Sequence, residues 1–125
     1  RFVIATTHLD HVSAEAQVEQ VREINRVMRE RYGRSVKPVF LGGDLNAEPA
    51  SETLRELRRA WRGLSGTDVG TYPSDGPTVC IDYFLQLDNG VACDVVDARV
   101  LDRFRAGDVS RASDHLPVML DIKLE

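Results

Sequence analysis

Polar residues that could carry chemistry occur at four places in the sequence, each beside or inside an apolar segment. They are His8, Asp44 with Asn46, Asp82, and Asp114 with His115. His8 and Asp44 follow predicted strands, whereas His115 precedes one. These groups would meet at one edge of a sheet if the last strand runs antiparallel to the first two. Such a convergence would form a single site.

The acid and the amide at residues 44 and 46 come just after a short apolar run that is bounded by a proline and two glycines. This pattern is typical of a short buried strand that ends at a Gly-Gly break. An acid and an amide just past a buried strand stand where α/β folds often carry out chemistry. The alternative is an Asx-type turn, in which Asp44 and Asn46 bond only nearby backbone. This segment alone does not decide between the two.

A carboxylate also lies in the middle of a strand predicted over residues 78–87, where Asp82 stands between Ile81 and Tyr83. An unpaired carboxylate among apolar neighbours is costly, so a hydrogen-bond donor is expected beside it. His115 is the candidate, because a carboxylate fixes the tautomer of an imidazole and favours its charged form. The alternative is that Asp82 faces solvent. His8 likewise has a plain interpretation, as a capping residue at a strand end.

Two metal sites are tested by spacing and are not favoured. A zinc site made of His8, His11 and an acid lacks the helical HExxH arrangement, and His11 is better interpreted as an exposed loop residue. An EF-hand calcium loop that begins at Asp44 would need Gly at its sixth position and Glu at its twelfth. Pro49 and Arg55 occupy those positions, so this loop is excluded.

The elements that must position these residues are predicted from periodicity and capping signals. A strand over residues 1–7, a helix from Ser13 to a stop at Gly33, and a strand over residues 38–41 form a β-α-β unit. The later elements are a helix from Ser51 that ends before Gly63, a loop over 63–77, the strand over 78–87, a turn at 88–90 that opens a hairpin into 94–101, a loop over 102–113, and a strand over 116–124.

Length and composition indicate one globular domain over residues 1–125. Hydrophobic residues make up 42% of the chain and charged residues 29%, and the net charge of −4 disfavours broad, non-specific nucleic-acid binding. No apolar run approaches the roughly 20 residues of a membrane span. Cys80 and Cys93 form no CxxC pair, so the redox compartment and the localisation stay open.

Taken together, the polar clusters resemble one family, the endonuclease/exonuclease/phosphatase superfamily. The motifs that carry the resemblance occur in the family's order; they are Thr7-His8-Leu9, Gly43-Asp44-Leu45-Asn46, Ile81-Asp82-Tyr83-Phe84 and Ser113-Asp114-His115-Leu116-Pro117. The resemblance implies an α/β fold, namely half of a four-layer α/β sandwich with a mixed β-sheet and flanking helices. It places residues 1–125 as the C-terminal part of such a domain.

The resemblance also implies Mg²⁺- or Mn²⁺-dependent cleavage of a phosphoester and assigns roles to the matching residues. Asp44 resembles the acid that activates the attacking water. His115 resembles the histidine that contacts the scissile phosphate, with Asp82 as its orienting partner. His8 resembles the histidine that stabilises charge on the phosphate oxygens. Phosphoryl transfer depends mainly on positioning and charge neutralisation, so this set is chemically coherent.

The residues that the resemblance places near the metal are Asp44, Asn46 and Asp114. The family's main metal-binding glutamate belongs to its N-terminal half, so we expect this chain to lack the primary metal site. Cys80 stands where the family often has a basic residue, which puts one substrate contact in doubt.

Two functions are therefore expected from the sequence. The first is a metal-dependent phosphoesterase that acts on a small-molecule or lipid phosphoester more readily than on duplex DNA, given the acidic balance of the chain. The second is a non-catalytic binding or interaction module that retains the fold. In either case we expect residues 1–125 alone to expose an apolar sheet face, to self-associate or require the N-terminal half of the domain, and to have little activity.

Overall fold

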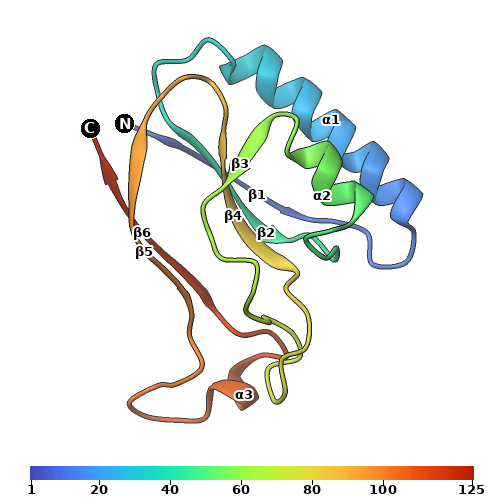
Figure 1. Ribbon diagram of the computed structural model, residues 1–125, viewed down its shortest axis with the longest axis vertical. Helices are drawn as coiled ribbons and strands as arrows, with labels where there is room; N and C mark the ends of the chain where they lie inside the picture. Colours follow the sequence, from blue (N-terminus) through green and yellow to red (C-terminus); the bar gives the residue numbers. More distant parts are fainter.

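The computed structural model describes residues 1–125, and the chain forms three layers (Figure 1). A four-stranded sheet separates two helices on one face from a two-stranded sheet on the other. The elements in chain order are β1 (Val3–His8), α1 (Ala14–Tyr32), β2 (Val39–Asp44), α2 (Glu52–Leu57), β3 (Trp61–Gly63), β4 (Asp82–Leu87), β5 (Cys93–Val100), α3 (Val109–Ala112) and β6 (Val118–Leu124). The expected α/β fold with a mixed sheet and flanking helices is confirmed.

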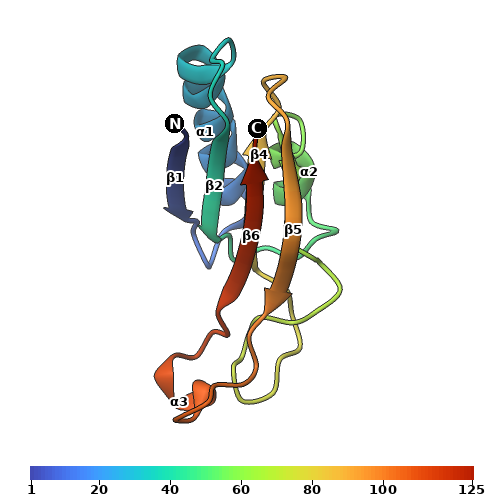
Figure 2. The same ribbon diagram turned by 90° about the vertical axis from the view of Figure 1, so that its left-hand side faces the viewer.

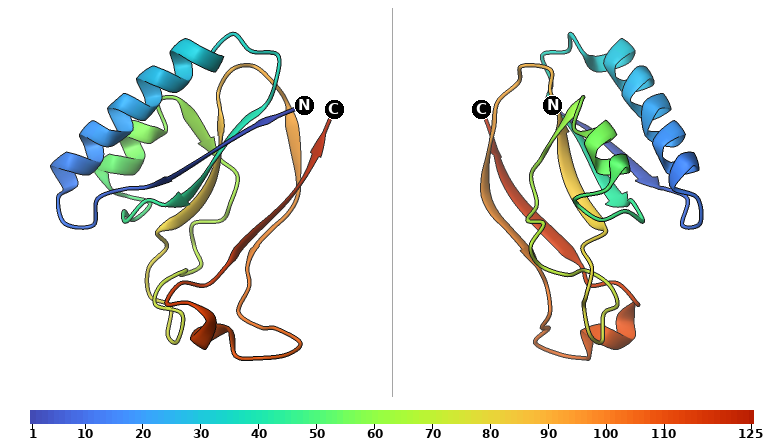
Figure 3. Two further views of the ribbon diagram at one scale, coloured as in Figure 1. Left: turned by 180° about the vertical axis from the view of Figure 1, so that it is seen from behind. Right: turned by 45° about the vertical axis from the view of Figure 1, so that its right-hand side comes forward.

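The four-stranded sheet has the strand order β1-β2-β4-β3. β1 and β2 are parallel and are joined by α1, which confirms the predicted β-α-β unit. β4 runs antiparallel to both of its neighbours, and β5 pairs with β6 in the second sheet (Figure 3). The strands of the larger sheet therefore bring the ends of β1 and β2 and the start of β4 to the same edge.

The long helix α1 forms where the sequence predicts it because its start and its packed face are both encoded locally. The Ser13 hydroxyl accepts a hydrogen bond from the backbone N–H of Ala16 at 3.1 Å, and Val21 is fully buried against the sheet. Asn25 connects this helix to the next elements: its amide donates to the carbonyl of Glu56, and its oxygen accepts from the indole of Trp61 at 2.9 Å. None of the helices has the length and hydrophobicity needed to cross a membrane.

The glycine pair in the second strand does not end that strand, contrary to the sequence prediction. β2 continues through Gly42 and Gly43 to Asp44. A side chain at Gly43, whose φ is 151°, would collide with the carbonyl oxygen of Thr7 on β1. A Cβ at Gly42 would lie 2.9 Å from the ring of Phe84 on β4. The glycines thus allow close approach between neighbouring strands, whereas the sequence alone suggested a turn.

The predicted hairpin after β4 is wrong because β4 has no free edge. β2 and β3 occupy its two sides, so the turn at residues 88–90 carries the chain across to the second sheet, where β5 pairs with β6. β4 also begins at Asp82 rather than at residue 78. Asp82 is therefore at the start of the strand and not in its middle.

Two short elements were not predicted from the sequence. The second helix ends at Leu57, and the residues expected to continue it contain β3, which pairs with the end of β4. The loop predicted over 102–113 contains the single turn of helix α3. Elements of three or four residues carry too little periodicity to be recognised without their tertiary neighbours.

An apolar groove, which we call the open groove, lies between the first two strands and β6. Figure 2 shows β1 and β2 beside the two-stranded sheet rather than behind it. Phe2 is 54% exposed and Ile4 is 68% exposed. The groove is lined by Phe2, Ile4, Phe40, Gly42, Phe84, Leu120, Ile122 and Leu124. Clustered apolar side chains of this kind are typical of a surface that another polypeptide covers.

Substitution of Gly43 by Ala should destabilise the chain, because the new methyl group would meet the backbone of β1 at a positive φ. We expect the free energy of unfolding to fall by at least about 1–3 kcal/mol. Urea denaturation followed by circular dichroism measures this. Gly76→Ala is the matched control, because a Cβ at Gly76 meets nothing within 4 Å. Equal effects of the two substitutions would contradict the assigned role of Gly43.

The isolated chain should self-associate through the open groove. We expect light scattering to give a mass above that of a 14.0 kDa monomer, and Ile4→Lys to shift the population toward the monomer. Val36→Lys is the control, since Val36 is a strongly exposed apolar residue outside the groove. A clean monomer of the unsubstituted chain at all accessible concentrations would show that the groove does not drive association.

Candidate active site

Three of the candidate residues form a row across neighbouring strands of the larger sheet. His8 is the last residue of β1, Asp44 is the last of β2, and Asp82 is the first of β4. The strand register pairs His8 with Asp44, and Asp44 with Asp82. Paired residues on neighbouring strands project to the same side of a sheet, so the three side chains share one face.

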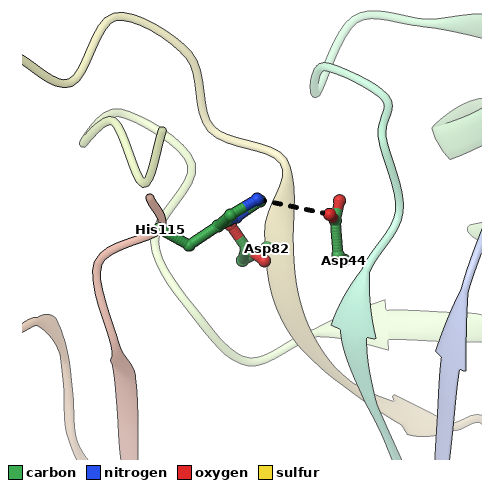
Figure 4. A group of neighbouring side chains, drawn as sticks. All are labelled: Asp44, Asp82 and His115. Atoms are coloured by element: carbon green, nitrogen blue, oxygen red, sulfur yellow. Dashed lines mark hydrogen bonds and ion pairs between the residues drawn. The ribbon is translucent and has the colours of Figure 1, made fainter. Parts of the chain in front are cut away.

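The fourth candidate reaches this row from the other sheet. His115 lies just before β6, and β6 pairs with β5 rather than joining the sheet that contains β1 and β2. The prediction concerned only the direction of the last strand, and the structure adds that this strand lies in the second sheet. The side chains still converge, because the segment before β6 places His115 against Asp82 and Asp44 at the ends of β4 and β2. Figure 4 shows His115, Asp82 and Asp44 pointing toward one another.

The imidazole of His115 is held between two carboxylates. Its Nδ1 lies 2.8 Å from Oδ2 of Asp82, and its Nε2 lies 3.5 Å from Oδ2 of Asp44. An Nδ1–H that donates to Asp82 leaves Nε2 directed toward Asp44 and the cavity. The hydrogen bond between Asp82 and His115 is the pairing that the cost of an unpaired carboxylate led us to expect.

The Asx-type turn at Asp44 is present, but it occupies only one oxygen of the carboxylate. Oδ1 accepts a hydrogen bond from the backbone N–H of Asn46 at 2.8 Å, which is the Asx-type turn. Oδ2 lies 3.3 Å from Nε2 of His8 and 3.5 Å from Nε2 of His115. The turn thus holds the carboxylate in place while one of its oxygens faces the imidazoles.

The turn itself is fixed by hydrogen bonds from the long helix. Asn46 adopts a left-handed conformation with φ 47°, and its side-chain N–H donates to the carbonyl of Leu9 at 2.8 Å. The buried Gln17 of α1 donates to the carbonyls of both Asp10 and Asn46. Because the Asn46 amide nitrogen is used in this way, its Oδ1 is left available for water or a cation.

An open cavity of about 600 Å³ lies over the row. It is lined by His8, His11, Asp44, Asn46, Tyr72, Ile81, Asp82, Asp114 and His115. All six residues singled out in the sequence therefore lie at one site, although Asp114 is exposed and does not contact the row. His11, interpreted as a loop residue, is exposed and also reaches the cavity rim.

Sequence reasoning missed the contribution of Tyr72 to this cavity. Its ring packs on that of His115, with the ring centroids 4.9 Å apart. The sequence did contain a signal, because Tyr72 is an aromatic residue inside a predicted loop rich in Gly, Ser and Pro. An aromatic residue in such a loop is not expected to be there to fill the core, so it is a candidate for a functional site.

The surroundings of His115 favour its protonated form. Partial burial of the ring opposes the charge, but the hydrogen bond to Asp82 and the negative charges of Asp82, Asp44 and Asp114 outweigh it and raise the pKa of His115 above 6.5. One potential ligand atom from each of Asp44, Asp82 and His115 lies within 4.8 Å of the others. The site can therefore gather positive charge either on the imidazole or on a bound cation.

The contribution of His115 to stability should fall as the pH rises. A raised pKa means that protonation favours the folded state, so the contribution is complete below pH 6.5 and is lost as the pH passes through the higher pKa of the folded chain. We expect the unfolding free-energy difference between the wild type and His115→Gln to shrink from about pH 6 to about pH 9. Urea denaturation in EDTA measures it, and His11→Gln controls for loss of an imidazole. A difference that grows with pH would contradict the assignment.

Comparison with known proteins places the chain in one family. The sequence matches the Endonuclease/Exonuclease/phosphatase family over residues 7–115. No curated protein sequence matches it at a significant level. The solved structures show the same fold, and the chain spans about half of their length.

Three similar structures illustrate the range of that fold. The mannosyl-6-phosphatase of Bacteroides thetaiotaomicron has a TM-score of 0.75 at 20% identity, covering 98% of this chain and 51% of that one. The human Nocturnin catalytic domain with bound sulfate has 0.75 at 20%, covering 99% and 47%. Beta toxin of Staphylococcus aureus with bound magnesium ions has 0.62 at 16%, covering 92% and 51%. With its motifs, its fold and most of its length matched, the chain belongs to the Endonuclease/Exonuclease/phosphatase family.

Proposed function

We propose that this chain supplies the water-activating acid and the Asp-His pair of a divalent-metal-dependent phosphoesterase. Members of the family are hydrolytic phosphoesterases and nucleases. The observation that carries the proposal is the arrangement of Asp44, Asp82 and His115 beside one cavity, with the His115 imidazole bonded to Asp82 and directed toward Asp44.

The chemical roles follow from which atoms face the cavity. Oδ2 of Asp44 is the acceptor for a proton of the attacking water, since its Oδ1 is already bonded to backbone. Protonated His115 donates from Nε2 to a phosphate oxygen, while Asp82 holds Nδ1 and stabilises the imidazolium. His8 has a 73% exposed side chain at the end of the row, where it can donate a further hydrogen bond to the phosphate.

A divalent cation fits the donor set of this cavity. Carboxylate and amide oxygens are the ligands that Mg²⁺ and Mn²⁺ prefer, and the unbonded Oδ1 of Asn46 adds to the oxygens of Asp44. Asp44, Asn46 and Asp114 would hold the ion. When bound, it would neutralise charge on the phosphate and lower the pKa of a water molecule. The proposed ions are Mg²⁺ and Mn²⁺.

The substrate that we propose is a small-molecule or lipid phosphoester. A net charge of −4 gives no general attraction for duplex DNA, whose binding depends on neutralising many phosphates. About half of each similar structure lies outside the matched region, so the complete activity is proposed for a protein in which a comparable N-terminal segment covers the open groove. This segment is the partner that we propose for the groove.

The test is a pair of substitutions in the full-length native protein. Asp44→Asn and His115→Gln should each lower Mg²⁺-dependent hydrolysis of bis(p-nitrophenyl) phosphate by about 10²–10⁴-fold, and EDTA should abolish the wild-type activity. Asp121→Asn, which removes an exposed carboxylate from β6, is the control. Unchanged turnover in both site variants would overturn the proposal. Substrate binding without any turnover in the wild type would favour a non-catalytic module.

A further inference from the structure

The segment that holds His115 is fixed by a neighbouring loop that the proposed chemistry does not use. Residues 71–74, which we call the strap, bond to the backbone on both sides of His115. The backbone N–H of Ser74 donates to the carbonyl of Asp114 at 2.7 Å. The carbonyl of Thr71 accepts from the N–H of Leu116 at 2.8 Å. The backbone on each side of His115 is thereby held by a hydrogen bond to the strap.

The strap is also tied to the segment that leads into β4. The hydroxyl of Thr71 accepts from the N–H of Ile81, the residue just before Asp82, at 3.2 Å. Tyr72 forms an isolated bridge with Val79. Thr71 is 1% exposed, so these bonds are shielded from water. One loop therefore holds the approaches to both Asp82, which begins β4, and His115, which lies in the segment before β6.

The backbone hydrogen bonds of the strap do not by themselves set the rotation of the imidazole. Its hydrogen bond to Asp82 sets that rotation, and the ring of Tyr72 packs against the imidazole in the same orientation. The centroids of the two rings are 4.9 Å apart, with an interplanar angle of 48°. No hydrogen bond joins the Tyr72 hydroxyl to another residue, so contact with His115 is made by the ring and not by the phenol. The ring is partly exposed and lines the cavity, so it does not serve to fill the core.

We propose that Tyr72 is a positioning residue for His115: its ring packs against the imidazole and keeps Nδ1 on Asp82 and Nε2 toward Asp44 and the cavity. In this role Tyr72 fixes the reacting geometry without taking part in proton transfer. The kinetic consequence rests on the proposed function, whereas the geometric consequence does not. A ring without a hydroxyl should therefore suffice at this position.

The kinetic test uses the full-length native protein with Mg²⁺ and bis(p-nitrophenyl) phosphate. Tyr72→Leu should lower kcat by about 10–100-fold and change KM by less than about threefold, because a misplaced reacting group affects the transition state more than ground-state binding. Tyr72→Phe should restore kcat to within about twofold of the wild type. Phe104→Leu, which removes an exposed aromatic residue outside the cavity, should have no effect. If Tyr72→Leu does not fold, Tyr72→Gln replaces it.

A second measurement detects the position of the His115 imidazole relative to the ring of Tyr72. Proton–carbon correlation NMR of the His115 ring C–H groups should show the ring-current shift from Tyr72 in the wild type and in Tyr72→Phe, and its loss in Tyr72→Leu. If this signal behaves as expected while His115→Gln leaves hydrolysis unchanged, the proposed function fails and the positioning role stands. If His115→Gln abolishes hydrolysis while Tyr72→Leu alters neither kcat nor the imidazole signal, the positioning role is overturned and the proposed function stands.

Discussion

Two carboxylates at directly opposed positions on neighbouring antiparallel strands impose the strongest constraint on this structure. Asp44 and Asp82 are register partners on β2 and β4. Like charges so placed repel, and the repulsion must be offset by a positive charge close to both. His115 meets this requirement, since its two ring nitrogens face one carboxylate each and its pKa is raised by them. The segment before β6 thus brings a neutralising imidazole to the edge of the larger sheet, whereas the two sheets pack on each other through apolar side chains such as Phe40 and Leu120.

The same constraint supports the proposal that the site binds a phosphate and a cation. The two carboxylates favour a positive group between them, and either a protonated imidazole or a bound metal ion can supply that charge. Asp44 would contact either positive group, because one of its oxygens is held by the turn and the other is directed at the imidazoles. The turn lets the acid keep its position whichever positive group occupies the cavity.

The register of the strands brings His8, Asp44 and Asp82, which are far apart in the sequence, side by side. A slip of one residue between β1 and β2 would send His8 and Asp44 to opposite faces of the sheet. The two glycines of β2 permit the close strand spacing that fixes the register, since side chains at those positions would meet Thr7 and Phe84. The site therefore depends on residues that carry no chemistry themselves.

The parts of this structure that could be predicted are those that local signals encode. The helix α1 has its capping serine and its apolar stripe within its own residues, and the pairing of Asp82 with His115 followed from the cost of an unpaired carboxylate. The predicted hairpin after β4 does not form, because the strand with which β5 can pair depends on which edges of the larger sheet are already occupied. Tyr72 was missed for a similar reason: its contact with His115 joins residues 43 positions apart, and no periodicity reports that.

The polar row and the open groove are parts of one sheet face, which links what covers the groove to the chemistry of the site. Along β1 and β2, the register pairs that project to this face pass from Ile4 with Phe40, through Thr6 with Gly42, to His8 with Asp44. A polypeptide that covers the apolar end would border the polar end and exclude water beside it. Lower local dielectric strengthens every charge interaction there, including those of His115 with its two carboxylates. Covering the groove would therefore bury its apolar side chains and strengthen the electrostatics of the site by the same contact.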